Sequence, residues 1–178
     1  MVSLYLFFYA CLELRFPDVE TDPGPLRPVI GECRILCSNV RGLSKNLSNV
    51  TVASSQYDLL LCSETLVSDR RHKSEFLVPG FGHPVLLCWD GVPRAHWMAA
   101  YVRLGYGAFR QPKFGCGCCE MLVFRVCGAR QNFYVFSLYC NPGLDDRIYY
   151  CLLTAMAAVQ AADARAAFLF VGDLIGHH

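Results

Sequence analysis

Four residues whose side chains carry oxygen atoms each stand at the end of a short apolar run of the sequence. Asn39, Glu64 and Tyr139 end three such runs, and Asp173 follows Gly172 at the end of a fourth. In α/β enzymes the carboxyl ends of strands are where ligands and chemistry are placed. Carboxylate and amide oxygens suit a hard divalent cation such as Mg²⁺, and a phenol can hydrogen-bond a phosphate oxygen. If the runs are strands, these side chains could together serve phosphodiester hydrolysis, in which a cation stabilises the negative charge of the transition state.

Taken alone, each of these positions has a simpler interpretation. Asp173 after a buried strand is most simply a carboxylate that caps the next turn. A general base that would activate water is also missing, because His177 and His178 are adjacent terminal residues that we interpret as structural. The chemical hypothesis therefore depends on the rest of the chain bringing the four positions together.

The composition is that of one globular domain. The chain has 178 residues, of which 54% are hydrophobic and 17% charged, a length that suits a single domain with a substantial core. Its net charge of +1 gives no electrostatic reason to expect a nucleic-acid partner. There are 11 cysteines, and Cys37, Cys62 and Cys88 lie inside apolar runs. We interpret these as small buried residues in a reducing compartment and expect no disulfide framework.

The first 30 residues differ from the remainder. Met1–Cys11 is apolar but too short to span a membrane, and it lacks the positive start of a signal peptide. We therefore expect no membrane partner and no secretion. Asp18–Pro25 contains two prolines around a glycine, which predicts a rigid turn or linker. The predicted division is an apolar N-terminus with a linker over residues 1–30 and a domain over residues 31–178.

The expected elements alternate between strand and helix. Strands are predicted over Cys33–Ser38 and Tyr57–Ser63, with a weak helix over Leu43–Ser54 between them, so that Asn39 and Glu64 reach one edge of a parallel pair. The other predicted elements are strands over Val85–Trp89 and Met98–Val102, an antiparallel pair over Met121–Val126 and Asn132–Tyr139, a helix from Asp145 to Ala162 and a buried strand over Ala166–Val171. The charged stretch Val67–Glu75 is predicted to be an exposed, solvated loop, with contact to phosphates as the alternative.

Several short segments, taken together in their order and spacing, resemble the endonuclease domain of non-LTR retrotransposons. This domain is a member of the exonuclease–endonuclease–phosphatase superfamily, which includes apurinic-site endonucleases and DNase-I-like nucleases. The segments are Ser38–Leu43, Cys62–Thr65, Met98–Arg103, Ser137–Tyr139 followed by Asn141 and Pro142, and Phe170–Asp173. Asp18–Pro25 also resembles a ribosome-skipping peptide, in which Asp22 stands in place of an asparagine.

The resemblance implies a two-sheet α/β sandwich of the DNase-I-like type and a Mg²⁺-dependent nicking of DNA, with Mn²⁺ as a substitute ion. It places Asn39 in the metal and phosphate pocket and makes Glu64 the principal metal ligand. Tyr139 would contact the scissile phosphate, and Asp173 would orient or activate the attacking water. The implied partner is DNA, the implied location is the nucleus or cytoplasm, and the expected state is a monomer or an aggregation-prone chain.

The chain also departs from the pattern that it resembles. Ile175 stands where the family has an asparagine that stabilises the transition state, and Cys140 stands where an arginine is common. Ala95–Trp97 replaces a glycine-rich turn. The sequence ends at His178, before the family's Ser-Asp-His segment, so we expect the fold to be C-terminally incomplete and the nicking to be impaired. The alternative is a non-catalytic nucleic-acid-binding or interaction remnant.

Overall fold

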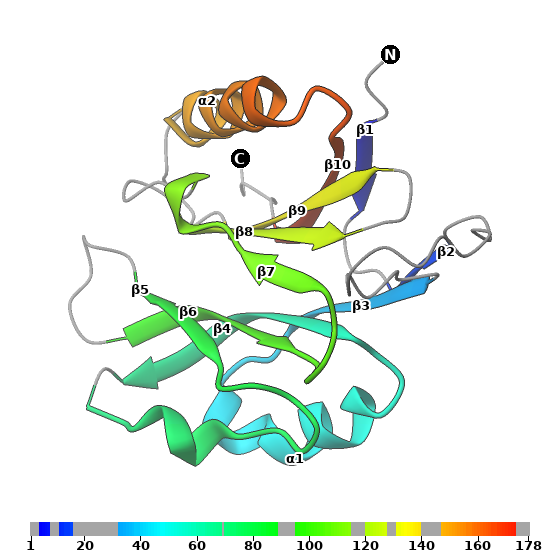
Figure 1. The fold of residues 1–178 in the computed structure, drawn as a ribbon. Coiled ribbons are helices and arrows are strands. Elements are labelled where there is room, and N and C mark those ends of the chain that lie inside the picture. Colours follow the sequence, from blue (N-terminus) through cyan, green and yellow to red (C-terminus); the bar gives the residue numbers. More distant parts are fainter. Residues whose placement is uncertain are drawn as a thin grey trace.

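Two mixed sheets of five strands each pack face to face in the computed structural model (Figure 1). The structure describes residues 4–7, 11–15, 32–68, 70–88, 95–114, 120–127, 131–139 and 147–173. Sheet A has the spatial order β1 (Leu4–Phe7), β10 (Ala167–Asp173), β9 (Asn132–Tyr139), β8 (Glu120–Cys127) and β7 (Ala108–Arg110). Sheet B has the order β2 (Cys11–Arg15), β3 (Glu32–Asn39), β4 (Leu59–Ser68), β6 (Ala95–Val102) and β5 (Val85–Cys88). This is the α/β sandwich that the sequence predicted.

Within the described residues, two α-helices cover the outer faces of the sheets, which gives this part of the molecule four layers. Helix α1 (Leu43–Ser54) covers sheet B and helix α2 (Arg147–Ala162) covers sheet A (Figure 1). Two short 3-10 helices, η1 (Lys73–Phe76) and η2 (Pro112–Phe114), lie in the connections. The three resulting interfaces are apolar. Their fully or nearly fully buried residues include Ile35, Leu61 and Leu122 between the sheets, Leu43 and Leu60 under α1, and Phe136 and Phe170 under α2.

The burial of both sheet faces explains the continuous apolar runs of the central strands. In β9, every residue from Tyr134 to Tyr139 is buried, and in β10 the buried run covers residues 168–172. A strand that is covered on both faces needs apolar side chains at odd and even positions alike. The predicted antiparallel pair formed by β8 and β9 and the buried strand that follows α2 are both confirmed.

The predicted strand–helix–strand unit is also confirmed. Helix α1 has the predicted bounds Leu43–Ser54, and β3 runs parallel to β4 with Asn39 opposite Ser63. Arg103, directly after β6, joins the end of α1 to the segment before β4. Its guanidinium donates to the carbonyls of Ser54 at 2.8 Å and Tyr57 at 3.0 Å. The last turn of α1 is thereby fixed to the start of β4.

The prediction was wrong about where β4 ends. The strand does not stop at Ser63 but continues to Ser68, and its pairing with β6 shifts register between Ser63 and Val67. Val67, which was predicted to begin an exposed loop, is fully buried. The extra residues between Ser63 and Val67 bulge out of the ladder, and β4 pairs with β6 again from Val67 onward. The residues from Arg70 to Glu75 are exposed, as expected.

The N-terminal stretch supplies two strands that were not predicted from the sequence. Strand β1 pairs in parallel with β10, and β2 pairs antiparallel with β3, so this stretch contributes one strand to each sheet. Neither of the two α-helices that the structure describes is long and apolar enough to span a bilayer. The linker Asp18–Pro25 lies outside the described residues, and the boundary near residue 30 stays a prediction.

The cysteines in apolar runs behave largely as expected. Cys62 is 1% exposed and Cys37 is half-buried, while the side chain of Cys88 lies outside the described part. Burial raises the pKa of the Cys33 and Cys62 thiols to about 12, so both stay protonated at neutral pH. A neutral buried thiol packs as a small apolar group and is a poor nucleophile.

Candidate functional site

Backbone hydrogen bonds of the loop between β3 and α1 hold Asn39 next to Glu64. The amide of Val40 donates to the carbonyl of Ser63 at 3.0 Å, and the amide of Gly42 donates to the carbonyl of Glu64 at 2.7 Å. The side-chain oxygen of Asn39 accepts a hydrogen bond of 3.1 Å from the amide of Arg41. These contacts hold the two predicted metal-binding positions on neighbouring strands of sheet B.

The backbone at this place is strained. Arg41 and Glu64 have φ values of 44° and 51°, and Leu66 two residues later also has φ of 51°. A side chain in this left-handed region costs about 1–2 kcal/mol per residue. Such strain persists only where the surrounding structure enforces it, and it clusters at functional sites. Its presence at Glu64, inside a register shift of β4, marks this carboxylate as a functional candidate.

Tyr139 and Asp173 are neighbours on sheet A. Strands β9 and β10 run in parallel, with Tyr139 opposite Asp173 in the last pair of the register. Tyr139 is 6% exposed and packs among the residues between the sheets. The side chain of Asp173 lies outside the described part of the structure, which places only its backbone.

An aromatic stack connects the two pairs across the sandwich. The ring of Trp97 in β6 lies parallel to that of Tyr139, with 5.9 Å between centroids and 14° between planes. Trp97 precedes Met98, which pairs with Ser63 next to Glu64. Strand β10 also packs against β3 and β4. The ends of β3, β9 and β10 and the shifted segment of β4 therefore share one rim of the sandwich, the side to which these strands run in Figure 1. The four predicted positions thus form two pairs of neighbours, Asn39 with Glu64 on sheet B and Tyr139 with Asp173 on sheet A, and the Trp97–Tyr139 stack links the two sheets.

Solved structures with the same architecture are known, although the sequence matches no protein-family model and no curated protein. The APE2 catalytic domain of Xenopus laevis superimposes with a TM-score of 0.58 and 16% identity, covering 81% of this chain and 59% of that chain. The AP endonuclease LMAP of Leishmania major gives 0.56 and 17%, covering 79% and 54%. The endonuclease domain of TRAS1, a telomere-specific non-LTR retrotransposon, gives 0.53 and 15%, covering 78% and 58%.

The chain has the DNase-I-like fold. It is the fold of the exonuclease–endonuclease–phosphatase superfamily, as the sequence resemblance implied. The chain spans between 54% and 59% of the length of these three similar structures. Identities of 15–17% establish the architecture, and the chemistry has to be argued from the residues themselves.

The donor set on this DNase-I-like rim suits a hard divalent cation. Glu64 offers a carboxylate and Asn39 an amide oxygen, and both side chains are only half-buried, so water and a phosphate could complete the coordination. Among the described residues no group of three or more His, Cys, Asp or Glu side chains could hold a metal. A carboxylate and an amide oxygen, completed by a substrate phosphate and water, are the kind of oxygen ligands that Mg²⁺ takes.

Sequence reasoning assigned no role to two residues at this rim. Arg41 belongs to the Ser38–Leu43 segment, but only its φ and its hydrogen bond to Asn39 show where it lies. Trp97 was visible as a departure from a glycine-rich turn, and its indole N–H is buried without a hydrogen-bond partner in the described part of the chain. Cys140, Ile175, His177 and His178 lie outside the described residues.

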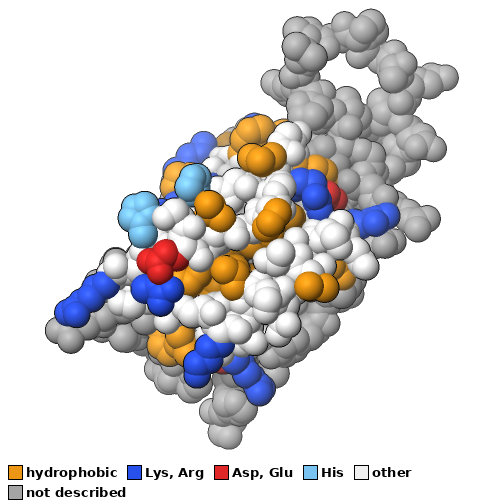
Figure 2. Space-filling view, turned by 90° about the horizontal axis from the view of Figure 1, so that it is seen from below, with side chains coloured by type: hydrophobic (Ala, Val, Ile, Leu, Met, Phe, Trp, Pro, Cys, Tyr) orange, Lys and Arg blue, Asp and Glu red, His pale blue; other side chains and the backbone are white. Residues whose placement is uncertain are grey.

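The exposed loop that follows β4 is ordered and basic. Arg71 pairs with Glu75 at 2.6 Å and lies over the ring of Phe76, whereas Arg70 and Lys73 are exposed cations. The side chain of His72 caps η1, which fixes the path of the loop. On the face that carries α1, Lys and Arg side chains lie at several separate places (Figure 2). No single basic patch dominates that face, in agreement with the small net charge.

Proposed function

We propose that this protein is an endonuclease-like domain that hydrolyses DNA phosphodiester bonds with the help of a divalent cation, at a low rate. The observation that carries the proposal is two pairs of neighbouring positions in a DNase-I-like sandwich, Asn39 with Glu64 and Tyr139 with Asp173, with the Trp97–Tyr139 stack between the sheets and a strained backbone at Glu64. The similarity to the TRAS1 endonuclease and to AP endonucleases supports DNA as the substrate. A DNA substrate would also be met inside the cell, in the nucleus or cytoplasm.

Each residue has a distinct role in this proposal. The oxygens of Glu64 and Asn39 hold Mg²⁺, or Mn²⁺ in its place. A bound ion of this type neutralises the charge that develops on the phosphate during hydrolysis. The phenol of Tyr139 donates a hydrogen bond to a non-bridging phosphate oxygen, and the parallel ring of Trp97 fixes its orientation. Asp173 orients the attacking water and accepts its proton.

The low rate follows from the sequence after Asp173. Ile175 cannot donate the hydrogen bond that an asparagine would give to the transition state. Loss of one such donor costs about 3 kcal/mol of barrier, or a factor of about 100 in rate. The proposed activity is therefore weak.

Incubation of supercoiled plasmid with the full chain is expected to give slow nicking in Mg²⁺ and none in EDTA. Glu64→Gln should lower the nicking rate at least about tenfold, because an amide supplies the shape of the carboxylate without its charge. Ile175→Asn should raise the rate about 100-fold. The readout is the fraction of nicked circles on an agarose gel over time.

Asp163→Asn is the matched control for the carboxylate. Asp163 accepts hydrogen bonds from Asn132 and Arg165 at the opposite end of sheet A, so its loss should leave the nicking rate unchanged. Nicking that persists in EDTA or in Glu64→Gln would refute metal-dependent hydrolysis. Rapid nicking by the unmodified chain would refute the proposal that Ile175 lowers the nicking rate.

A non-catalytic nucleic-acid-binding remnant is the second candidate. It is favoured by the exposed basic loop after β4, whose path is fixed where the His72 side chain caps η1. In this case DNA would bind through its phosphates without being cut. Binding of this kind requires cations that carry no internal counter-ion, and Arg70 and Lys73 are the candidates.

Binding of duplex DNA in EDTA is expected to weaken when Arg70→Ala and Lys73→Ala are combined. Each lost phosphate contact reduces the slope of log K against log salt by about 0.9, so the double variant should lose about 2 from the slope. Fluorescence anisotropy of labelled duplex at several NaCl concentrations measures this slope. Lys113→Ala, which removes a cation beside the Phe114 ring of η2, is the control and should not change it. An unchanged slope in the double variant would show that this loop does not contact DNA.

A further inference from the structure

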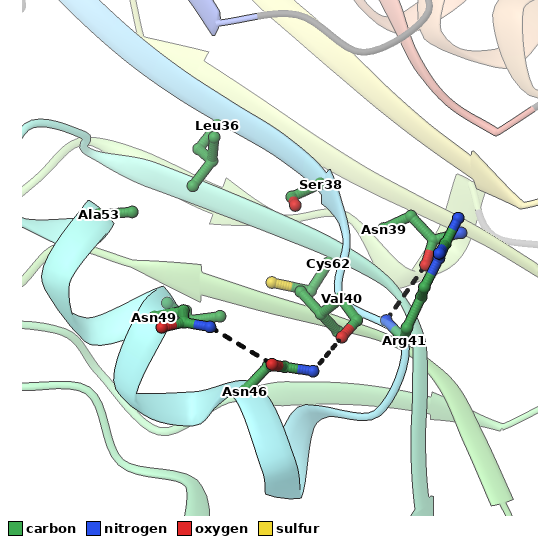
Figure 3. Close-up of a pocket in the computed structure, with 10 residues that line it drawn as sticks. Leu36, Ser38, Asn39, Val40, Arg41, Asn46, Asn49, Ala53 and Cys62 are labelled. Atoms are coloured by element: carbon green, nitrogen blue, oxygen red, sulfur yellow. Dashed lines mark hydrogen bonds between the residues drawn. The ribbon is translucent and has the colours of Figure 1, made fainter.

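A cavity of about 420 Å³ lies between β3 and α1, next to the candidate site (Figure 3). Its apolar wall comes from three elements and consists of Leu36, Val50, Ala53 and Cys62. Small-molecule sites in proteins usually measure about 300–1,000 Å³ and combine apolar walls with a few polar groups. The volume and the wall therefore suit a flat organic ring.

The opposite side of the cavity is polar, and part of it is held in place. The amide of Asn46 donates to the carbonyl of Val40 at 2.8 Å, and the amide of Asn49 donates to the side-chain oxygen of Asn46 at 3.3 Å (Figure 3). The side-chain oxygen of Asn49 and the hydroxyl of Ser38 have no hydrogen-bond partner among the described residues. A pre-positioned amide and a hydroxyl thus face the cavity with unused hydrogen-bonding capacity.

A cation stands at one end of the cavity. Arg41 lies beside Asn39 and lines the cavity with it (Figure 3). The side chain is exposed and forms no ion pair within the part of the chain that the structure describes. Its backbone is held at φ of 44° by the hydrogen bond to Asn39. In Figure 3 the exposed Arg41 side chain extends alongside Asn39, from where its guanidinium, which has no counter-ion in the described part of the chain, can turn toward a phosphate or carboxylate group at that end of the cavity.

We propose that this cavity is a nucleotide-binding site, in addition to the proposed cleavage site. The base lies against Leu36, Val50 and Ala53, and its hydrogen-bonding edge meets Asn49 and Ser38. Asparagine amides are well suited to base edges, adenine in particular. The phosphate meets Arg41. The site uses neither Glu64 nor a metal, so it does not require the cleavage site to be active.

Titration of the full chain with dAMP in EDTA, followed by calorimetry, tests the proposal. Saturable binding is expected, at least about tenfold tighter than binding of adenosine, because the phosphate forms charge-assisted hydrogen bonds with Arg41. Arg41→Asn keeps a residue that tolerates positive φ. It should lower the affinity for dAMP to that for adenosine. Ala53→Leu fills the cavity and should weaken both ligands at least tenfold.

Val52→Ala is the matched control on the same helix, because Val52 is 78% exposed and does not line the cavity. It should leave dAMP binding unchanged. Asn49→Leu, at an exposed position, gives a second cavity variant if Ala53→Leu fails to fold. Absence of saturable dAMP binding, or binding that survives Ala53→Leu or Asn49→Leu, would overturn the proposal. Loss of binding in Glu64→Gln would place the nucleotide at the cleavage site instead.

The two proposals fail separately. Plasmid nicking without dAMP binding would leave the cleavage site standing and remove the cavity site. Metal-independent dAMP binding without any nicking would do the reverse.

Discussion

Gly172→Ala is expected to lower the free energy of unfolding by more than about 4 kcal/mol, the range of exceptional single substitutions. Gly172 has φ of 141°, a conformation that side chains rarely adopt. A Cβ added there would lie 2.8 Å from the carbonyl carbon and 2.9 Å from the amide nitrogen of Leu138, and closer still to its carbonyl oxygen. These are backbone atoms of the paired strand β9, so neither strand can move without losing its ladder. Urea unfolding followed by far-UV circular dichroism measures the loss.

Gly105→Ala separates the two causes of this effect. Gly105 also has positive φ, at 79°, but a Cβ there would meet nothing within 4 Å. Its replacement should cost about 1–2 kcal/mol, from the backbone conformation alone. Similar losses for Gly105→Ala and Gly172→Ala would show that the approach of β10 to β9 is not the tight contact described above.

The Gly172 substitution also bears on the rim. Because Gly172 lies between Val171 in the core and Asp173 at the strand end, a displaced β10 would move Asp173 away from its pairing with Tyr139. Any variant that still folds should therefore lose the proposed nicking activity, although no candidate side chain has been changed.

Arg103→Ala is expected to lower the free energy of unfolding by about 3 kcal/mol. The guanidinium pairs with Asp58 at 3.1 Å, donates to the carbonyls at the end of α1, and lies 4.9 Å from the ring centroid of Phe81. Asp58 in turn accepts a hydrogen bond of 3.0 Å from the amide of Arg34 in β3. The side chains of Arg103 and Asp58 are 31% and 20% exposed. Removing Arg103 therefore leaves the Asp58 carboxylate unpaired in a poorly solvated place.

Two variants serve as controls for this prediction. Arg103→Lys keeps the charge but loses the planar fork, and should retain only part of the stability. Arg71→Ala removes an exposed pair with Glu75 and should cost less than about 1 kcal/mol. A loss for Arg103→Ala no greater than that for Arg71→Ala would contradict a structural role for the guanidinium network.

The sequence predicted the elements whose signal is local. Helix α1, the β8–β9 pair and β10 follow from apolar runs and turn residues that can be seen within a few positions. The continuation of β4 was missed because the polar residues Ser63, Glu64 and Thr65 interrupt the apolar run, and only pairing with β6 shows that the strand resumes at Val67. Strands β1 and β2 were missed because their partners, β10 and β3, lie far along the chain.

The candidate site divides in the same way. Asn39, Glu64, Tyr139 and Asp173 could be selected because polar residues after apolar runs mark strand ends. The contribution of Trp97 could not be predicted, because its contact with Tyr139 joins two different sheets. The strained φ of Glu64 has no sequence signal at all, since it is imposed by the register shift around it.

The position of β10 between β1 and β9 has a consequence for how the chain reaches this structure. Among the described strands β10 is made last, yet it lies inside sheet A, between β9 and the edge strand β1, which is nearest the N-terminus. Until residues 167–173 have left the ribosome, β1 has no partner and the edge of β9 is open. Contacts that join the two extremes of a chain are slow to form, and unpaired edges are exposed to other chains in the meantime. Sheet A should therefore form late, and chaperone dependence should be greatest before residues 167–173 have emerged.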